Sequence, residues 1–65
     1  MKNVQPGMNV ARQRSRFDHA IGAAPTLAHA RYLTYLRDEF DAGVAGGQPQ
    51  PFSWFYPRYE EEFDL

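Results

Sequence analysis

The feature that most constrains this chain is a proline-interrupted cluster of aromatic residues near its C-terminal end. The segment from Gly47 to Leu65 reads GQPQPFSWFYPRYEEEFDL and holds six of the ten aromatic residues and three of the five prolines. Proline lacks an amide hydrogen and disfavours the interior of a helix, so the pattern predicts an extended arm. An extended aromatic arm needs a surface to cover its rings, either on its own small body or on another molecule.

The length of the chain limits how much stability its own core can supply. At 65 residues it is at most one small domain. A core of this size rarely supplies more than about 3–5 kcal/mol of net stability and usually needs a further stabilising element. The sequence has no cysteine, so disulfides are excluded, and no Cys/His cluster indicates a zinc site. Association with larger proteins, or with copies of itself, is the remaining source of stability. We expect no cofactor and no small-molecule substrate.

Hydrophobic patterning bears on where the protein resides. No stretch of about 18 apolar residues occurs, so we expect no membrane span. No apolar run follows the basic residues near the start of the chain, so we expect no signal peptide and no secretion. The absence of cysteine is compatible with a reducing compartment. We therefore expect a location in the cytoplasm, or within a virion assembled there.

Two segments have helical patterns. Asn9 is a good N-cap residue, and helical periodicity places Val10, Phe17 and Ile21 on one face, which predicts a helix over about 10–21.

For the second segment, Pro25 suits a first helical position and Gly43 suits a C-terminal cap, which predicts a helix over about 26–42. Its apolar stripe consists of Tyr32, Leu33, Leu36 and Phe40.

The predicted fold is therefore small and mainly α, with two short helices followed by a Gly/Pro linker and an extended aromatic arm. An extended lead-in occupies residues 1–8 and the helical pair residues 9–43. The linker occupies residues 44–51 and the aromatic and acidic docking arm residues 52–65.

Charge is distributed unevenly along the chain. Residues 1–31 carry five basic side chains and one acid, whereas residues 32–65 carry two basic side chains and seven acids. This asymmetry is compatible with head-to-tail association, with two different partners, or with halves that neutralise each other in one fold. Asp38, Glu39 and Asp41 crowd the end of the second helix, where the helix dipole disfavours anions. Their position indicates weakly that they serve a contact.

The arm is the predicted partner-binding segment, because tryptophan and tyrosine are enriched at the energetic centres of protein interfaces. The predicted partner-binding residues are Phe52, Trp54, Phe55, Tyr56, Tyr59, Phe63 and Leu65. The alternative is that the arm folds back and completes the core over the two helices. Six rings exceed what two short helices can cover, so we expect some rings in the core and the remainder at an interface.

A second, charge-based contact is predicted on the first helix. It consists of Arg12, Arg14 and Arg16. The planar guanidinium suits phosphate or carboxylate. Three arginines are few for nucleic-acid affinity, and the net charge of the chain is −1. An acidic surface on a protein is therefore an equally good target.

Catalytic patterns are absent from the sequence. His19 and His29 are ten residues apart and do not have metal-ligand spacing, and the serines lack a G-x-S-x-G setting. We therefore expect a non-enzymatic protein.

The preferred hypothesis is protein–protein interaction, in the form of a small accessory or structural subunit of a larger assembly such as a virion or a multiprotein complex. The alternative is a small regulator or inhibitor of the phage type, which binds and blocks one enzyme or transcription component. A third hypothesis is a nucleic-acid-associated protein that uses the arginine face.

Overall fold

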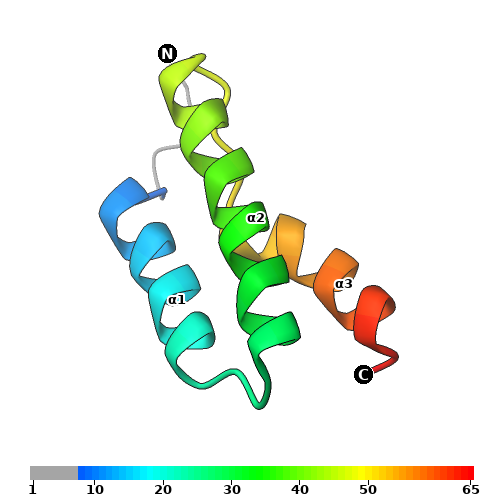
Figure 1. The fold of residues 1–65 in the computed structure, drawn as a ribbon. Helices are drawn as coiled ribbons and strands as arrows, with labels where there is room; N and C mark the ends of the chain where they lie inside the picture. Colours follow the sequence, from blue (N-terminus) through cyan, green and yellow to red (C-terminus); the bar gives the residue numbers. More distant parts are fainter. Residues whose placement is uncertain (1–7) are drawn as a thin grey trace.

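The computed structural model describes residues 8–65, which form three helices: α1 (Val10–Gly22), α2 (Leu27–Ala45) and α3 (Phe52–Phe63). Helices α1 and α2 lie side by side and run in opposite directions, and α3 runs obliquely to both (Figure 1). The small, mainly α character predicted from the sequence is confirmed. Apart from Met8, the predicted lead-in lies outside the described residues.

Side-chain caps define where the first two helices begin. The Asn9 side chain accepts a hydrogen bond from the Arg12 backbone N–H at 3.0 Å, as the sequence predicts. Thr26 caps α2 in the same way, because its hydroxyl accepts from the His29 N–H at 3.2 Å. Pro25 therefore precedes the cap rather than occupying the first turn. The helices match the predicted pair closely, except that α2 extends to Ala45.

The prediction of an extended aromatic arm is wrong, because this segment is the helix α3. Phe52, Phe55 and Tyr59 are spaced three and four residues apart, so a helix turns all three rings to one side, where they are buried. Burying a large apolar side chain contributes about 1.5–3 kcal/mol, whereas a proline inside a helix costs about 3 kcal/mol. Three buried rings therefore outweigh the cost of Pro57, which lies in the second turn.

The core is centred on Phe17, whose side chain is fully buried. Its ring centroid lies 5.3 Å from that of Phe40 on α2, and 4.9 and 5.6 Å from those of Phe52 and Phe55 on α3. The buried set is Phe17, Leu33, Leu36, Phe40, Phe52, Phe55 and Tyr59. Thus α1 contributes one fully buried ring, and both other helices pack on it.

The segment between α2 and α3 folds against the end of α2. Gly47 has a positive φ of 77°, and the Gln48 N–H donates to the Gly43 carbonyl at 2.9 Å. A Cβ at Gly43 would lie 3.1 Å from the Gln48 oxygen, so this glycine permits the close approach of the returning chain. Gly43 therefore lies inside α2, where its lack of a side chain eases this approach, and it does not cap the helix.

One long-range hydrogen bond fixes the start of α3. The Gln13 side-chain carbonyl accepts from the Phe52 N–H at 2.8 Å. The residue before α3 is Pro51, which has no side chain that could cap the helix. A residue of α1 thus satisfies an N–H group that the first turn of a helix leaves unpaired.

Removing Pro57 should stabilise the protein. In Pro57→Ala the backbone regains an N–H that can bond to the Ser53 carbonyl, and the ring no longer crowds that carbonyl. We expect the free energy of unfolding to rise by about 2 kcal/mol in urea titrations. The matched control is Pro25→Ala, outside the helices, which should give no gain. A loss of stability in Pro57→Ala would contradict the helical assignment of this segment.

Truncating the central ring should unfold the chain. Phe17→Ala removes a fully buried ring, at a cost of about 3–5 kcal/mol, which is comparable to the whole stability of a domain this small. Circular dichroism should show a largely unfolded variant at 25 °C. Val10→Ala, on the same helix at a side chain that is 37% exposed, should change stability by less than about 1 kcal/mol. Equal effects of the two substitutions would contradict this core.

Candidate functional site

The predicted partner-binding residues divide into three groups. Phe52, Phe55 and Tyr59 are buried in the core. Tyr56 and Phe63 are half-buried and pack against it. The exposed members are Trp54, at 53%, and Leu65, at 67%. Most of the aromatic cluster is therefore used within the chain, and Trp54 is the ring of α3 that points most clearly to an external surface.

Trp54 lies beside a charged and aromatic group that joins α3 to α2. The Arg58 guanidinium is 6.0 Å from the Trp54 ring centroid and forms an ion pair with Glu39 of α2 at 2.8 Å. One turn before Glu39, Tyr35 is 49% exposed, and its ring centroid lies 5.8 Å from that of Tyr32. We call these five residues the Trp54 face.

Contacts within the Trp54 face shift the pKa values of three of its residues. The Tyr35 hydroxyl, and then Arg58, lower the pKa of Glu39 below its ordinary value. The same contact with Glu39 raises the pKa of Tyr35. Hydrogen bonding to Glu39 raises the pKa of Arg58. The ionised form of Glu39 is thus favoured, and it pairs with Arg58 beside an exposed tryptophan.

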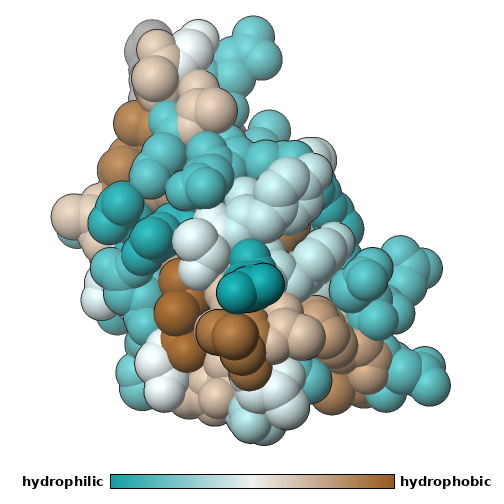
Figure 2. Space-filling model, viewed as in Figure 1, coloured by the Kyte–Doolittle hydropathy of each residue, from teal (hydrophilic) through white to brown (hydrophobic). Residues whose placement is uncertain are grey.

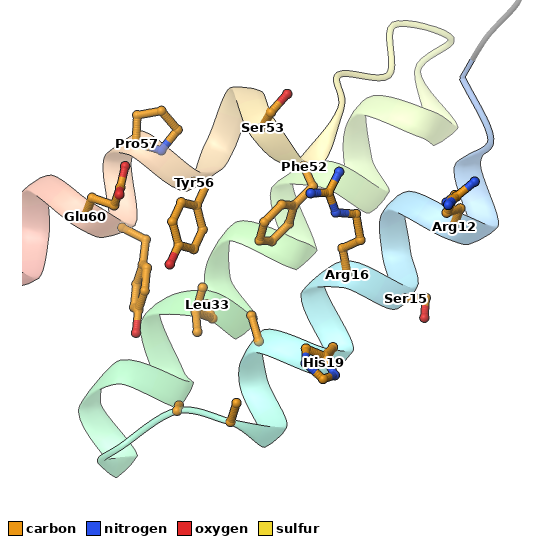
Figure 3. Close-up of a pocket in the computed structure, with 14 residues that line it drawn as sticks. Arg12, Ser15, Arg16, His19, Leu33, Phe52, Ser53, Tyr56, Pro57 and Glu60 are labelled. Carbon is orange, nitrogen blue, oxygen red and sulfur yellow. The ribbon is translucent and has the colours of Figure 1, made fainter. Parts of the chain in front are cut away.

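A groove with a volume of about 960 Å³ lies on the other side of α3, between α3 and α1. Leu33 of α2 contributes to its floor, and Phe52 and Tyr56 of α3 point into it (Figure 3). The opposite side is formed by α1, which contributes Arg12, Arg16, His19 and small residues including Ala20. The groove therefore has an apolar and aromatic side and a basic side.

The structure separates the three arginines predicted to form one contact. Arg14 forms two hydrogen bonds to the Asp41 carboxylate of α2, at 3.0 and 3.1 Å, and does not line the groove. This contact raises the pKa of Arg14. Arg16 instead lies over the Phe52 ring, with its guanidinium carbon 5.1 Å from the centroid. Arg12 and Arg16 are left on the groove.

Two of the three acids near the end of α2 form contacts, and both contacts lie within the chain. Asp41 pairs with Arg14 of α1, and Glu39 pairs with Arg58 of α3. A third pair, 2.6 Å long, joins Arg37 of α2 to Asp18 of α1. These ion pairs tie α2 to both of its neighbours.

Sequence reasoning missed Arg58 as a site residue, and it identified Tyr35 only as a contact residue outside the apolar stripe of α2. Arg58 follows Trp54 by four residues, which on a helix places both side chains on one face. The prediction of an extended arm hides this relation, because only a helix places the two side chains together. His19 and Tyr56 were recognised individually, but their shared groove depends on how α3 crosses α1.

The described part of the chain contains neither a metal-binding cluster nor a membrane-spanning helix. Within residues 8–65 no cluster of histidine, aspartate and glutamate could hold a metal ion. None of the described helices combines the length and hydrophobicity needed to cross a lipid bilayer. The face in Figure 2 is mostly hydrophilic, with hydrophobic residues gathered over the lower turns of α1 and α2.

Comparison with protein-family models, with curated proteins and with solved structures finds no match. The two surfaces that flank α3 are therefore the basis for inferring a function.

The Glu39–Arg58 pair should make stability depend on pH. A carboxylate with a lowered pKa contributes stability that is complete above its ordinary pKa of 4.5 and is lost as the pH falls through the lowered value. Glu39→Gln should therefore be less stable than the wild type at pH 7, by at most about 1 kcal/mol, and the difference should shrink at pH 3.

The matched control is Glu62→Gln, an exposed acid on α3 that forms no ion pair within residues 8–65. Urea titrations at both pH values measure the effect. A constant difference between Glu39→Gln and the wild type across this range would show that the ion pair contributes nothing.

Proposed function

We propose that this protein is a non-enzymatic interaction protein that binds a larger protein through the Trp54 face. The observation that carries the proposal is the exposure of Trp54, at 53%, on a helix whose neighbouring rings are buried. Its ring contacts Phe55 edge-on, with the ring centroids 5.0 Å apart, and this contact still leaves about half of the tryptophan in water. Tryptophan, tyrosine and arginine are the residues most enriched at the energetic centres of interfaces, and all three gather here.

Part of the face is already held together within the chain. Arg58 forms a 2.8 Å ion pair with Glu39, and its guanidinium carbon lies 6.0 Å from the Trp54 ring centroid. Side chains that are already ordered lose less entropy on binding, so more of the contact energy is available for affinity. A partner with an apolar pocket for Trp54 and acceptors for Arg58 matches this face.

Two roles fit such a protein: an accessory or structural subunit of an assembly, such as a virion, or a small regulator that blocks one enzyme or transcription component. A specific observation favours the regulator as a candidate. The rings of α3 complete a core around Phe17, so the chain has a core of its own without a partner. A structural subunit with an incomplete core would instead be unfolded or self-associated when purified alone. Either role places the protein in the cytoplasm, or in a particle assembled there.

Trp54→Ala should abolish capture of the partner. Tagged wild type and variants would be used as bait in lysate from the source cells, with quantitative mass spectrometry, and the recovered partner would then be titrated in purified form. We expect Trp54→Ala to weaken binding by about 2 kcal/mol or more, roughly 30-fold. Leu27→Ala, at a side chain that is 66% exposed on α2 and outside the Trp54 face, should bind like the wild type.

Retention of the partner by Trp54→Ala would refute the proposed face. Point substitutions are the right test because deletion of residues 48–65 would remove three core rings together with the face. The purified pair then separates the two roles. A regulator should inhibit the recovered enzyme or transcription component, whereas an accessory subunit should copurify with an assembly that keeps its activity.

A further inference from the structure

We propose that the groove between α1 and α3 is a second binding site, which takes an acidic segment of a partner protein that carries a large apolar side chain. This site is separate from the Trp54 face. On a helix, Trp54 and Arg58 point away from Phe52 and Tyr56, which line the groove. The chain can therefore hold two partner segments at once, on opposite sides of α3.

The apolar part of the groove suits a hydrophobic side chain. Its volume of about 960 Å³ is at the upper end of the range for ligand pockets, about 300–1,000 Å³. Its apolar floor consists of Ala20 and Ala24, which are partly exposed, and the ring of Tyr56 stands beside it. Leu33 lies beneath this floor and is almost fully buried in the core. A leucine or phenylalanine that inserts between α1 and α3 would contact Ala20 and Ala24 on one side and Tyr56 on the other.

The basic part of the groove indicates the charge of the occupant. Three other arginines are neutralised inside the fold, through the pairs Arg14–Asp41, Arg37–Asp18 and Arg58–Glu39. Within residues 8–65, Arg12 and Arg16 form no such pair, and His19 lies one turn beyond Arg16 on the same wall. Guanidinium groups bind carboxylates with two parallel hydrogen bonds.

Arg16 has a defined position from which to bind. Its guanidinium carbon lies 5.1 Å from the Phe52 ring centroid, and Figure 3 shows the side chain reaching from α1 towards that ring. Stacking over a ring leaves the edge of the guanidinium free to donate hydrogen bonds. The position joins the basic wall to the aromatic wall, so a carboxylate on Arg16 would lie beside the apolar floor.

The charge balance favours an acidic peptide over a nucleic acid. Nucleic-acid affinity comes mainly from neutralising many phosphates, and the groove offers two arginines and one histidine. Glu60 lines one part of the groove, where it would repel a continuous phosphate backbone. A peptide can place its acids on Arg12 and Arg16 and keep uncharged residues near Glu60.

The test is a titration of the full chain with a fluorescein-labelled synthetic peptide in which glutamates flank a Leu-Phe pair. Comparison probes are the same peptide with serines in place of the Leu-Phe pair, and a single-stranded RNA oligonucleotide. Fluorescence anisotropy should show binding of the first peptide that weakens as salt is added. The serine peptide should bind at least about tenfold more weakly, since it cannot fill the apolar floor.

The decisive comparison is between Arg12→Glu and Arg31→Glu, which change the net charge of the chain equally. Arg12 lines the groove, whereas Arg31 is exposed on α2 away from it. Arg12→Glu should weaken peptide binding by about tenfold or more, and Arg31→Glu should change it by less than about twofold. Circular dichroism establishes that both variants are folded.

Three results would overturn the proposal: no binding of the peptide, equal effects of the two substitutions, or tighter binding of the RNA than of the peptide. The last result would assign the groove to nucleic acid. Trp54→Ala should leave peptide binding unchanged, so this test succeeds or fails independently of the Trp54 face.

Discussion

The packing of one phenylalanine against two helices underlies the rest of this structure. Phe17 is the fully buried side chain of α1, and its ring is within 6 Å of rings from both α2 and α3. The two pairs with α3 are edge-on, and aromatic pairs in this geometry contribute about 0.5–1.5 kcal/mol beyond the burial of their area. In a chain without disulfides, this cluster holds α3 in place despite a proline in its second turn. The two candidate surfaces exist because α3 is held there.

How α3 packs determines what each of its sides can do. The side that carries Phe52, Phe55 and Tyr59 faces the core, and Tyr56 extends this side into the groove next to α1. Trp54 points outward, beside Arg58, which forms an ion pair with Glu39 of α2. One helix therefore supplies the core contact, a wall of the groove and an exposed tryptophan. A change that loosens the core would affect both surfaces, whereas changes at Trp54 or Arg12 would affect one each.

The sequence predicts α1 and α2 well because their signals are local. Asn9 caps α1 as expected, and three of the four residues in the stripe that ends in Phe40 are buried, whereas Tyr32 is half-buried. Helix α3 is not predicted, because the proline disfavours a helix locally, although Phe52, Phe55 and Tyr59 have helical spacing. What offsets the proline is contact with Phe17, thirty-five residues away from Phe52 along the chain. No local pattern contains that contact. The sequence also does not show that Arg14 lies apart from Arg12 and Arg16, since the pairing of Arg14 with Asp41 depends on how α1 packs against α2.

The net charge of the chain is only −1, but the internal ion pairs determine where unpaired charge lies on its surface. Acids placed unfavourably for the dipole of α2 are used to bind Arg14 and Arg58, so much of the charge in the middle of the fold cancels. The charges outside these pairs include a basic groove wall on α1 and an acidic run, Glu60 to Glu62, at the end of α3. An acidic partner segment approaching the groove would be attracted by the first and repelled by the second. The arrangement therefore favours one orientation of the bound segment, with its acids towards the start of α1 and away from the end of α3.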